Sequence, residues 1–349
     1  MVGILTYYHI SNYGANFQAF ALQHTILEMG KEVVIIKYES SVITKRAIRR
    51  LFFKIKKEKH ILLKGLILFN SVRTHFDFKQ FRKKYIYIKK LDNNINKIIV
   101  GSDQVWNTDI NGGDLCYFVN FYQGKKYSYA ASFGYEKVPE KYVDGIKLLL
   151  DKFIYISVRE EKGRSILSEQ FGLLSEIVLD PIFFLTKEDW RKTFKLYNNE
   201  KREYLLIYII GNVSCDLRKY IINNYNYLTC INYNNCYVSD KLIKNKNCSI
   251  PSKWLSYILY SEVNVTNSYH GVIFSILFNK KFILYYTTKQ HFLSRLWGIF
   301  NLLEIKGNTI DLNEEEKLFI PDLNYDIINR KILPLKRKSK EYLSKIIEE

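Results

Sequence analysis

The sequence predicts an α/β protein made of two Rossmann-like, doubly wound domains that face each other across a cleft. Three observations support this fold class. Short apolar runs of strand length alternate with segments of helical periodicity, which is typical of parallel βαβ units. A polar stretch, Asn198–Glu203, has the composition of a linker and separates two such series. The chain has 349 residues, of which 47% are hydrophobic, so it has the length and the apolar content for about two domain cores.

The first domain is expected to comprise residues 1–195. Between its first two strands, Ala15–Met29 has apolar residues at helical spacing, and Gly30 follows as a stop. Residues 42–84 form a basic, mostly helical insertion, whose apolar positions either pack on the domain or face a partner. The apolar runs that we interpret as strands are Val2–Tyr8, Glu32–Tyr38, Lys97–Gly101, Lys125–Ser132, Phe153–Val158 and Glu176–Leu179.

The second domain is expected to comprise residues 196–335. Its predicted strands are Tyr204–Ile210, Tyr227–Asn232, Val263–Thr266 and Lys281–Tyr286, and its predicted helices are Asp216–Asn223, Ser252–Ser261, His270–Phe278 and Gln290–Leu303. The remaining segment, 336–349, contains a last helix at Ser339–Ile347, which we expect to return and pack on the first domain.

The charge of the chain narrows the choice of partners. There are 53 Lys and Arg against 35 Asp and Glu, a formal net charge of +18, which favours contact with nucleic acid, anionic lipid or an acidic substrate. The basic runs lie far apart and carry no zinc-finger, basic-zipper or RNP-type motif. We therefore expect no nucleic acid partner, and contact with the inner surface of the membrane stays open.

The cysteine content and the lack of long apolar segments indicate the cellular compartment. Five cysteines without a C-x-x-C pair argue against a disulfide framework and against a structural zinc site. The first residues are typical of a strand and not of an export signal, and no segment approaches the ~18 apolar residues of a membrane span. We expect a cytoplasmic protein, at most peripheral to the inner face of the membrane.

Residues 262–278 contain a short apolar strand, a polar turn with His270, and an apolar helix. Ligands of parallel α/β sheets bind beyond the carboxyl ends of the strands, where the next helix begins. The first turn of a helix offers unpaired N–H groups and a partial positive charge to an anion. The pattern therefore predicts a phosphate or a carboxylate beside His270. The alternative is a partly buried histidine that donates to a carbonyl.

Polar motifs at other strand ends accompany this turn, and each is weak when taken alone. In chain order the motifs are N-Y-G-A-N-F-Q-A-F-A-L-Q at 12–23, G-S-D-Q-V-W-N at 101–107, A-S-F-G at 131–134, S-V-R-E at 157–160, L-D-P at 179–181 and T-N-S-Y-H-G-V-I-F-S at 266–275. With these six motifs in this order, the chain resembles the polysaccharide pyruvyl transferase family over nearly its whole length.

The resemblance implies a fold similar to the GT-B glycosyltransferases. It implies a bacterial enzyme of capsule or exopolysaccharide biosynthesis that transfers pyruvate from phosphoenolpyruvate to hydroxyls of a sugar or a lipid-linked oligosaccharide. The products would be a pyruvate ketal and inorganic phosphate. Phosphoenolpyruvate is then a co-substrate, and neither a metal nor an organic cofactor is implied.

The same resemblance suggests roles for particular residues. Phosphoenolpyruvate carries a phosphate and a carboxylate, so its binding needs two or more cations, and a planar guanidinium suits either anion. Histidine manages proton transfer near neutral pH. We expect His270, Arg159 and Asp103 to be catalytic. Donor binding is assigned to Arg159, Ser268, His270 and Gly271, with Lys289 or Arg295 as a further cation, and acceptor binding to Asn12, Asn16, Asp103, Gln104 and Trp106.

Plainer interpretations stay open for several of these residues. Residues 101–107 also fit an Asp-capped helix start with Trp106 in the core, Arg159 also fits an ion pair near Glu160, and Asp180-Pro181 is typical of a turn. Two other functions remain. One is a GT-B-type glycosyltransferase with a nucleotide-sugar donor. The other is a non-catalytic basic binding protein, whose ligand affinity would fall steeply with salt but would not depend on His270 or Arg159.

Overall fold

A parallel sheet forms the centre of the first domain. The computed structural model describes the whole chain except residues 59, 234–241, 247–248 and 289–292. The sheet has the order β3-β2-β1-β4-β5, with every neighbouring pair parallel. Its strands are β1 (Val2–Leu5), β2 (Val33–Ile36), β3 (Ile88–Lys89), β4 (Lys97–Val100) and β5 (Lys125–Ser128). Single bridges join Tyr127 to Tyr155 and Ala131 to Val158, and so attach the short parallel pair β6 (Ser157–Val158) and β7 (Glu176–Ile177) beyond β5.

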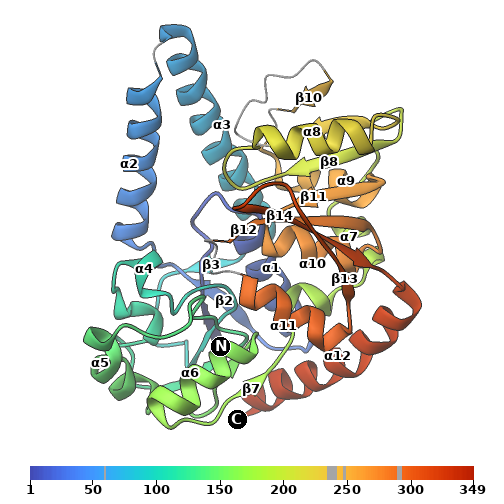
Figure 1. Cartoon of the computed structure of the whole chain (residues 1–349). Helices are drawn as coiled ribbons and strands as arrows, with labels where there is room; N and C mark the ends of the chain where they lie inside the picture. The colour runs from blue at the N-terminus through green and yellow to red at the C-terminus, as the bar shows by residue number, and fades with distance from the viewer. Residues whose placement is uncertain (59, 234–241, 247–248, 289–292) are drawn as a thin grey trace.

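Helices follow these strands. Helix α1 (Tyr13–Glu28) is buried along most of its length, and the Asn12 side chain caps it by accepting from the Ala15 amide at 3.0 Å. The predicted basic insertion is a pair of long helices, α2 (Ser41–Lys57) and α3 (Ile61–Tyr85), which project from the body of the protein (Figure 1). The other helices are α4 (Thr108–Asn111), η1 (Leu115–Phe118), α5 (Glu140–Leu150), α6 (Glu161–Phe171), η2 (Pro181–Phe184) and α7 (Lys187–Thr193).

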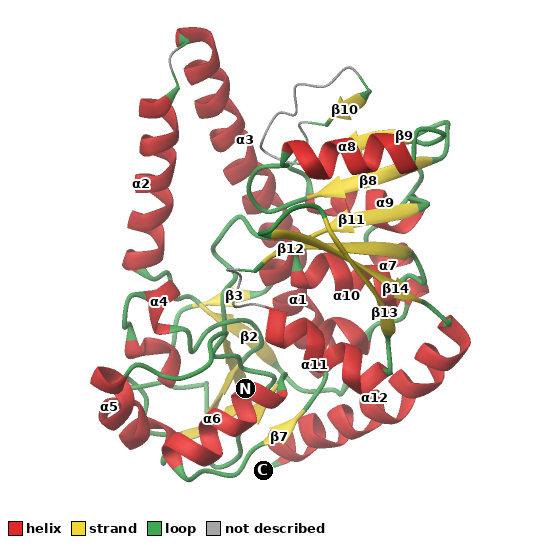
Figure 2. Cartoon of the chain, viewed as in Figure 1, coloured by secondary structure: helices red, strands yellow, loops and turns green. Residues whose placement is uncertain are grey.

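The second domain contains a larger sheet, in the order β10-β9-β8-β11-β12-β14-β13. The pairs from β10 to β12 are parallel, whereas β14 is antiparallel to both of its neighbours. The strands are β8 (Tyr204–Tyr208), β9 (Thr229–Asn232), β10 (Ile243–Asn245), β11 (Val263–Thr266), β12 (Lys281–Thr287), β13 (Lys306–Asp311) and β14 (Glu316–Asp322), and the helices are α8 (Cys215–Asn224), α9 (Pro251–Tyr260), α10 (Tyr269–Leu277), α11 (Leu293–Leu303) and α12 (Tyr325–Glu348). Two α/β domains, the first with a parallel sheet and the second with a mostly parallel one (Figure 2), confirm the predicted α/β fold class.

The last helix returns to the first domain, as predicted, but it is longer than the sequence indicated. Helix α12 begins at Tyr325 rather than near Ser339 and contains Pro334. Its carboxyl half is held by the first domain, because Lys97 Nζ donates to the Ile347 carbonyl at 3.0 Å and the Tyr342 hydroxyl donates to the Ser128 carbonyl at 2.9 Å. The helix therefore ties the carboxyl end of the chain to β4 and β5.

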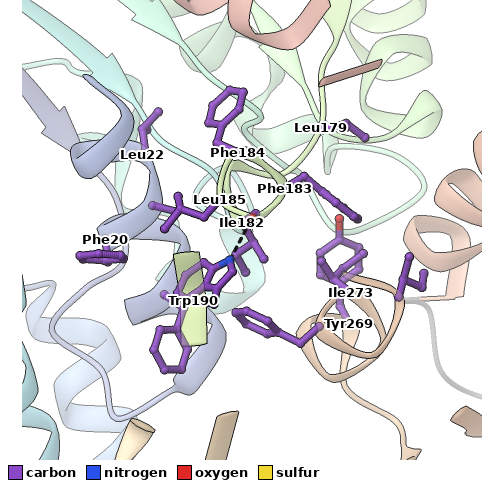
Figure 3. Packing of buried hydrophobic residues seen from close by; sticks show 14 of the residues in the cluster. Phe20, Leu22, Leu179, Ile182, Phe183, Phe184, Leu185, Trp190, Tyr269 and Ile273 are labelled. Atoms are coloured by element: carbon purple, nitrogen blue, oxygen red, sulfur yellow. Dashed lines mark hydrogen bonds between the residues drawn. The ribbon is translucent and has the colours of Figure 1, made fainter. Parts of the chain in front are cut away.

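One apolar core extends across both domains, beside a further core in each of them. Helix α1 of the first domain and α10 of the second both pack against the segment between them that contains η2. Figure 3 shows Phe20 from α1, Ile182 and Phe183 from η2, and Tyr269 from α10 around this segment. Because the core is continuous across the junction, residues of the two domains are held in a fixed relation there.

Candidate functional site

The strand-end motifs of the first domain meet at Arg159, which follows β6. Its guanidinium is fully buried. Nη1 lies 3.3 Å from Asp180 Oδ2, Nε lies 3.3 Å from Glu160 Oε2, and Nη2 lies 3.8 Å from Asp103 Oδ1. Burial alone would lower the pKa of Arg159, but Tyr269 and these carboxylates raise it above its ordinary value. The ion-pair interpretation of Arg159 therefore holds, with three acidic partners instead of one.

Asp180 links the first domain to the second. Its Oδ2 accepts from Ser102 Oγ at 2.9 Å, its Oδ1 accepts from the Ile182 amide at 3.1 Å, and His270 Nε2 lies 3.6 Å from Oδ2. Burial alone would raise the pKa of Asp180, but His270 and Arg159 hold it below its usual value. The sequence indicated only a turn at Asp180. The turn is present, as the start of η2, but the same carboxylate also contacts Arg159 and His270, two of the predicted catalytic residues.

His270 lies in the first turn of α10, and its side chain is 9% exposed. Ser268 caps this helix by accepting from the Gly271 amide at 3.3 Å, which places both in a local structural role. The side of the imidazole that carries Nδ1 faces the start of α1 in the first domain. A Cβ atom added at Gly14 would come within 1.9 Å of His270 Nδ1. Position 14 therefore has to be glycine, because the backbone of α1 lies directly against the ring.

A second buried guanidinium, that of Arg295, belongs to the same cluster. The Cζ atoms of Arg159 and Arg295 lie 4.3 and 5.6 Å from the ring centroid of Tyr269, the residue before His270. Burial, with the positive charge of Arg159 nearby, lowers the pKa of Arg295 to about 10. An anion placed beside a buried guanidinium stabilises its charged form and raises its pKa again. Arg295 therefore lies where a further cation for donor binding was expected, whereas Lys289 lies outside the described residues.

Asp103 and Gln104 complete the cluster from the loop after β4. Asp103 has a φ of 84°, a left-handed conformation that is uncommon for a residue other than glycine and that concentrates at functional sites. Its Oδ1 accepts from the Gln104 amide at 2.8 Å. With its amide oriented by the hydrogen-bond network, Gln104 accepts from Arg295 at 3.0 Å. The predicted sites for donor and acceptor therefore adjoin at these two side chains.

The prediction that Trp106 offers its ring to a sugar is wrong. Its side chain is fully buried, stacks on Phe118 and donates from Nε1 to the Tyr117 carbonyl at 3.0 Å. Asn16 is also buried, and its amide donates to the carbonyls of Ile10 and Asn12. Asn16 therefore stabilises the loop before α1, and Asn12 caps that helix. The contacts of Trp106, Asn16 and Asn12 therefore all stabilise the local structure.

Sequence reasoning missed Tyr269 and the double role of Asp180. A signal for Asp180 was present, because a carboxylate that directly follows a buried apolar run enters the carboxyl edge of a sheet, where charged side chains need partners. Tyr269 had no separate signal, since a tyrosine beside His270 also fits the apolar face of α10.

The fold is a two-domain α/β fold, with a buried charged cluster at the junction of the domains. A family model described as polysaccharide pyruvyl transferase matches residues 12–288, and the chain therefore belongs to that family. This finding confirms the resemblance that the motifs indicated. A search of curated protein sequences gives no significant match.

Solved structures with a similar chain path have little sequence identity to this protein. A UDP-N-acetylglucosamine 2-epimerase from Neisseria meningitidis, solved with UDP-GlcNAc, has a TM-score of 0.46 at 9% identity, covering 100% of this chain and 99% of its own. A UDP-N-acetylglucosamine 2-epimerase from Rickettsia bellii has a TM-score of 0.42 at 10% identity, covering 80% and 77%. A heptosyltransferase from E. coli has a TM-score of 0.36 at 9% identity, covering 80% and 87%.

Proposed function

We propose that this protein transfers pyruvate from phosphoenolpyruvate to hydroxyls of a sugar in a glycan precursor, forming a pyruvate ketal. Membership of the family supports the reaction class. The observation that carries the donor assignment is the pair of buried guanidinium groups, Arg159 and Arg295, on the ring of Tyr269 beside His270. Phosphoenolpyruvate has two anionic groups joined by a short rigid linkage, so it matches two fixed cations and a histidine.

The reaction needs three changes at the donor. Carbon C3 gains a proton, C2 bonds to the first hydroxyl oxygen, and a second hydroxyl oxygen then displaces phosphate from C2. One hydroxyl proton balances the new C–H bond and the other leaves with phosphate. In the proposed mechanism His270 supplies the proton to C3 and Asp103 receives a hydroxyl proton. Arg295 and Arg159 bind the anionic groups of the donor, and Arg159 also positions Asp180, Glu160 and Asp103 around it. No cofactor enters this scheme.

The acceptor side is proposed on the loop after β4, where Asp103 and Gln104 adjoin Arg295. Carboxylate and amide groups are the usual partners of sugar hydroxyls. An acceptor carried on a lipid at the inner membrane surface is consistent with the basic charge of the chain. We place the protein in the cytoplasm of a bacterium, in the biosynthesis of a capsule or an exopolysaccharide.

The first test is calorimetric titration of the purified protein with phosphoenolpyruvate, beside a uridine diphosphate sugar. We expect saturable binding of phosphoenolpyruvate, and its loss in His270→Ala and Arg295→Gln. Each loses a charged contact to the donor, which corresponds to at least about tenfold in affinity. Arg191→Gln is the matched control, because this exposed arginine on α7 pairs with its helical neighbour Glu188 and contacts none of the cluster residues named above.

The outcomes separate the functions. Binding of the nucleotide sugar alone would replace the donor and make the protein a glycosyltransferase. Binding of phosphoenolpyruvate with equal affinity by all variants would place the donor elsewhere and refute this site. Binding of any anion, lost with salt and independent of His270, would indicate the non-catalytic basic protein.

A further inference from the structure

The helical pair α2–α3, residues 41–85, is unlike the rest of the first domain. It leaves the sheet after the carboxyl end of β2 and returns to β3. Figures 1 and 2 show the two helices extending beyond the body of the domain, with their joined ends farthest away. We call this unit the hairpin. It begins at the same edge of the sheet as the loop after β4, which carries Asp103.

The hairpin concentrates the positive charge of the chain. Residues 41–84 contain fourteen Lys and Arg and two acidic residues, a net charge of +12 out of the +18 of the whole chain. Helix α2 alone has seven basic residues and no acidic one in its seventeen. All seven basic side chains of α2 are exposed. A surface of this kind is attracted to an anionic partner.

The hairpin also exposes large apolar side chains. On α3, five of them lie within an arc of about 100°, at 100° of rotation per residue, and so form one stripe along the helix. The stripe comprises Ile61, Leu68, Phe69, Val72 and Phe76, which are between 50% and 80% exposed. On α2, Ile48, Phe52 and Phe53 are between 62% and 69% exposed. By contrast, Phe78 and Phe81 near the end of α3 are buried in the protein core.

This combination favours one class of partner. Contiguous exposed apolar stripes mark surfaces that another apolar surface covers. A nucleic acid would use the basic residues but would leave the stripe on α3 in water. Helix α2 has most of its Lys and Arg on one side and Ile48 and Phe52 on the other, which is typical of segments that lie in the membrane interface. No helix among the described residues is long and apolar enough to cross a membrane.

We propose that the hairpin binds an anionic lipid bilayer, with its apolar side chains in the interface and its basic side chains on the lipid headgroups. The proposal deepens the function proposed above, because it names the surface that would present a lipid-linked acceptor. The base of the hairpin supports this orientation. Arg46 Nη1 donates to the Ile110 carbonyl at 2.8 Å and so joins α2 to α4, the helix that follows the Asp103 loop. A docked hairpin therefore brings the acceptor side toward the bilayer.

The test is sedimentation of the full chain with vesicles of phosphatidylcholine, with and without phosphatidylglycerol. We expect binding only to the anionic vesicles. Each basic residue near such a surface contributes enough that Arg50→Gln with Lys57→Gln weakens binding about 30-fold. Phe52→Ser and Phe69→Ser each weaken it about tenfold or more, because a ring then leaves the interface. All four side chains are exposed, so these variants should fold.

Controls carry the same changes elsewhere on the surface. Lys147→Gln with Lys201→Gln, and Leu174→Ser, remove exposed charges and a 93% exposed leucine outside the hairpin, and should bind like the parent protein. Equal weakening in hairpin and control variants would overturn the proposal. So would binding to a DNA duplex that Phe69→Ser does not affect, which would indicate a nucleic acid surface.

Two further readouts complete the design. Light scattering that shows a dimer in the parent and a monomer in Phe69→Ser would assign the stripe to a second copy of the chain, and would also overturn the proposal. Titration with phosphoenolpyruvate separates the two proposals, because neither vesicles nor acceptor are needed for donor binding. Hairpin variants that lose vesicle binding but keep donor binding leave the proposed function intact. If the parent protein binds anionic vesicles through the hairpin but does not bind phosphoenolpyruvate, the donor is refuted and the hairpin proposal stands.

Discussion

Gly14→Ala tests whether the first domain positions the histidine of the second. The backbone of α1 at Gly14 lies against the imidazole of His270. An alanine there places a methyl group 1.9 Å from Nδ1 and 2.2 Å from Cγ, where ordinary contact begins at 3.4 Å. The ring therefore has to move by about 1.5 Å, or the two domains have to separate. Both residues are buried in the junction, so little space is present for either movement.

The magnitude follows from two effects. Overpacking of a close-packed site costs about 1–3 kcal/mol of the free energy of unfolding. Displacement of a reacting group by about 1 Å costs roughly 100-fold in rate, and the affinity for phosphoenolpyruvate should fall with it. Gly65→Ala is the control, because a Cβ at this helical position in α3 meets nothing within 4 Å. It should leave donor binding unchanged and stabilise the protein by up to about 1 kcal/mol.

The assay is a double-mutant cycle on the free energy of unfolding in urea, with donor titration of each variant. His270→Ala removes the ring that the new methyl group meets, so Gly14→Ala should cost much less in that background. The coupling free energy should then be about 1–3 kcal/mol. If the two costs simply add, the contact between Gly14 and His270 does not control either residue, and the reasoning fails.

Other substitutions test the remaining parts of the cluster. Because the pKa of Asp180 is lowered in the folded protein, its stabilising contribution is present above pH ~4 and lost as the pH falls through the folded pKa. Asp180→Asn should lower the free energy of unfolding by about 3–5 kcal/mol at neutral pH and flatten its acid limb, as urea unfolding across pH would measure. Arg295→Gln should abolish donor binding at little cost in stability, whereas Arg159→Gln should cost about 3–5 kcal/mol because it leaves buried carboxylates unpaired; melting and titration compare the two. Trp106→Phe removes the donor to the Tyr117 carbonyl and should cost about 1–3 kcal/mol without changing donor affinity, which the same two measurements check.

The sequence predicts the fold correctly where burial alone determines the structure. Strands β1, β4, β8 and β11 are buried on both faces and therefore appear as short apolar runs between helical segments. The antiparallel pair β13–β14 was not predicted. Strand β13, Lys306–Asp311, is mostly exposed, and nearly all of its residues are polar or glycine. No apolar run therefore marks it in the sequence. It pairs with β14 in a local antiparallel β-hairpin, and this β-hairpin joins the sheet because β14 pairs with β12, a contact that periodicity within the segment cannot report.

The site was accessible only in part, for a related reason. Motifs at strand ends identify residues that reach the carboxyl edge of a sheet, and this placed Arg159, Asp103 and His270 correctly beside one another. The same rule does not tell which side chain of a motif points inward. Trp106 and Asn16 belong to the same motifs but fill the interior and the helix start, because rotation along each turn decides which residue faces the cluster.

The charge of the cluster has a consequence for donor binding. Its described side chains include three carboxylates, of Asp103, Glu160 and Asp180, against two guanidinium groups, of Arg159 and Arg295. Apart from His270, a donor that brings at least two negative charges would enter a group of side chains that is already negative by one. Bringing uncompensated charge into a buried site is costly, so the complex should take up protons from solution. The measured heat of phosphoenolpyruvate binding should then change with the ionisation enthalpy of the buffer. Equal heats in all buffers would mean that cations outside this cluster neutralise the donor.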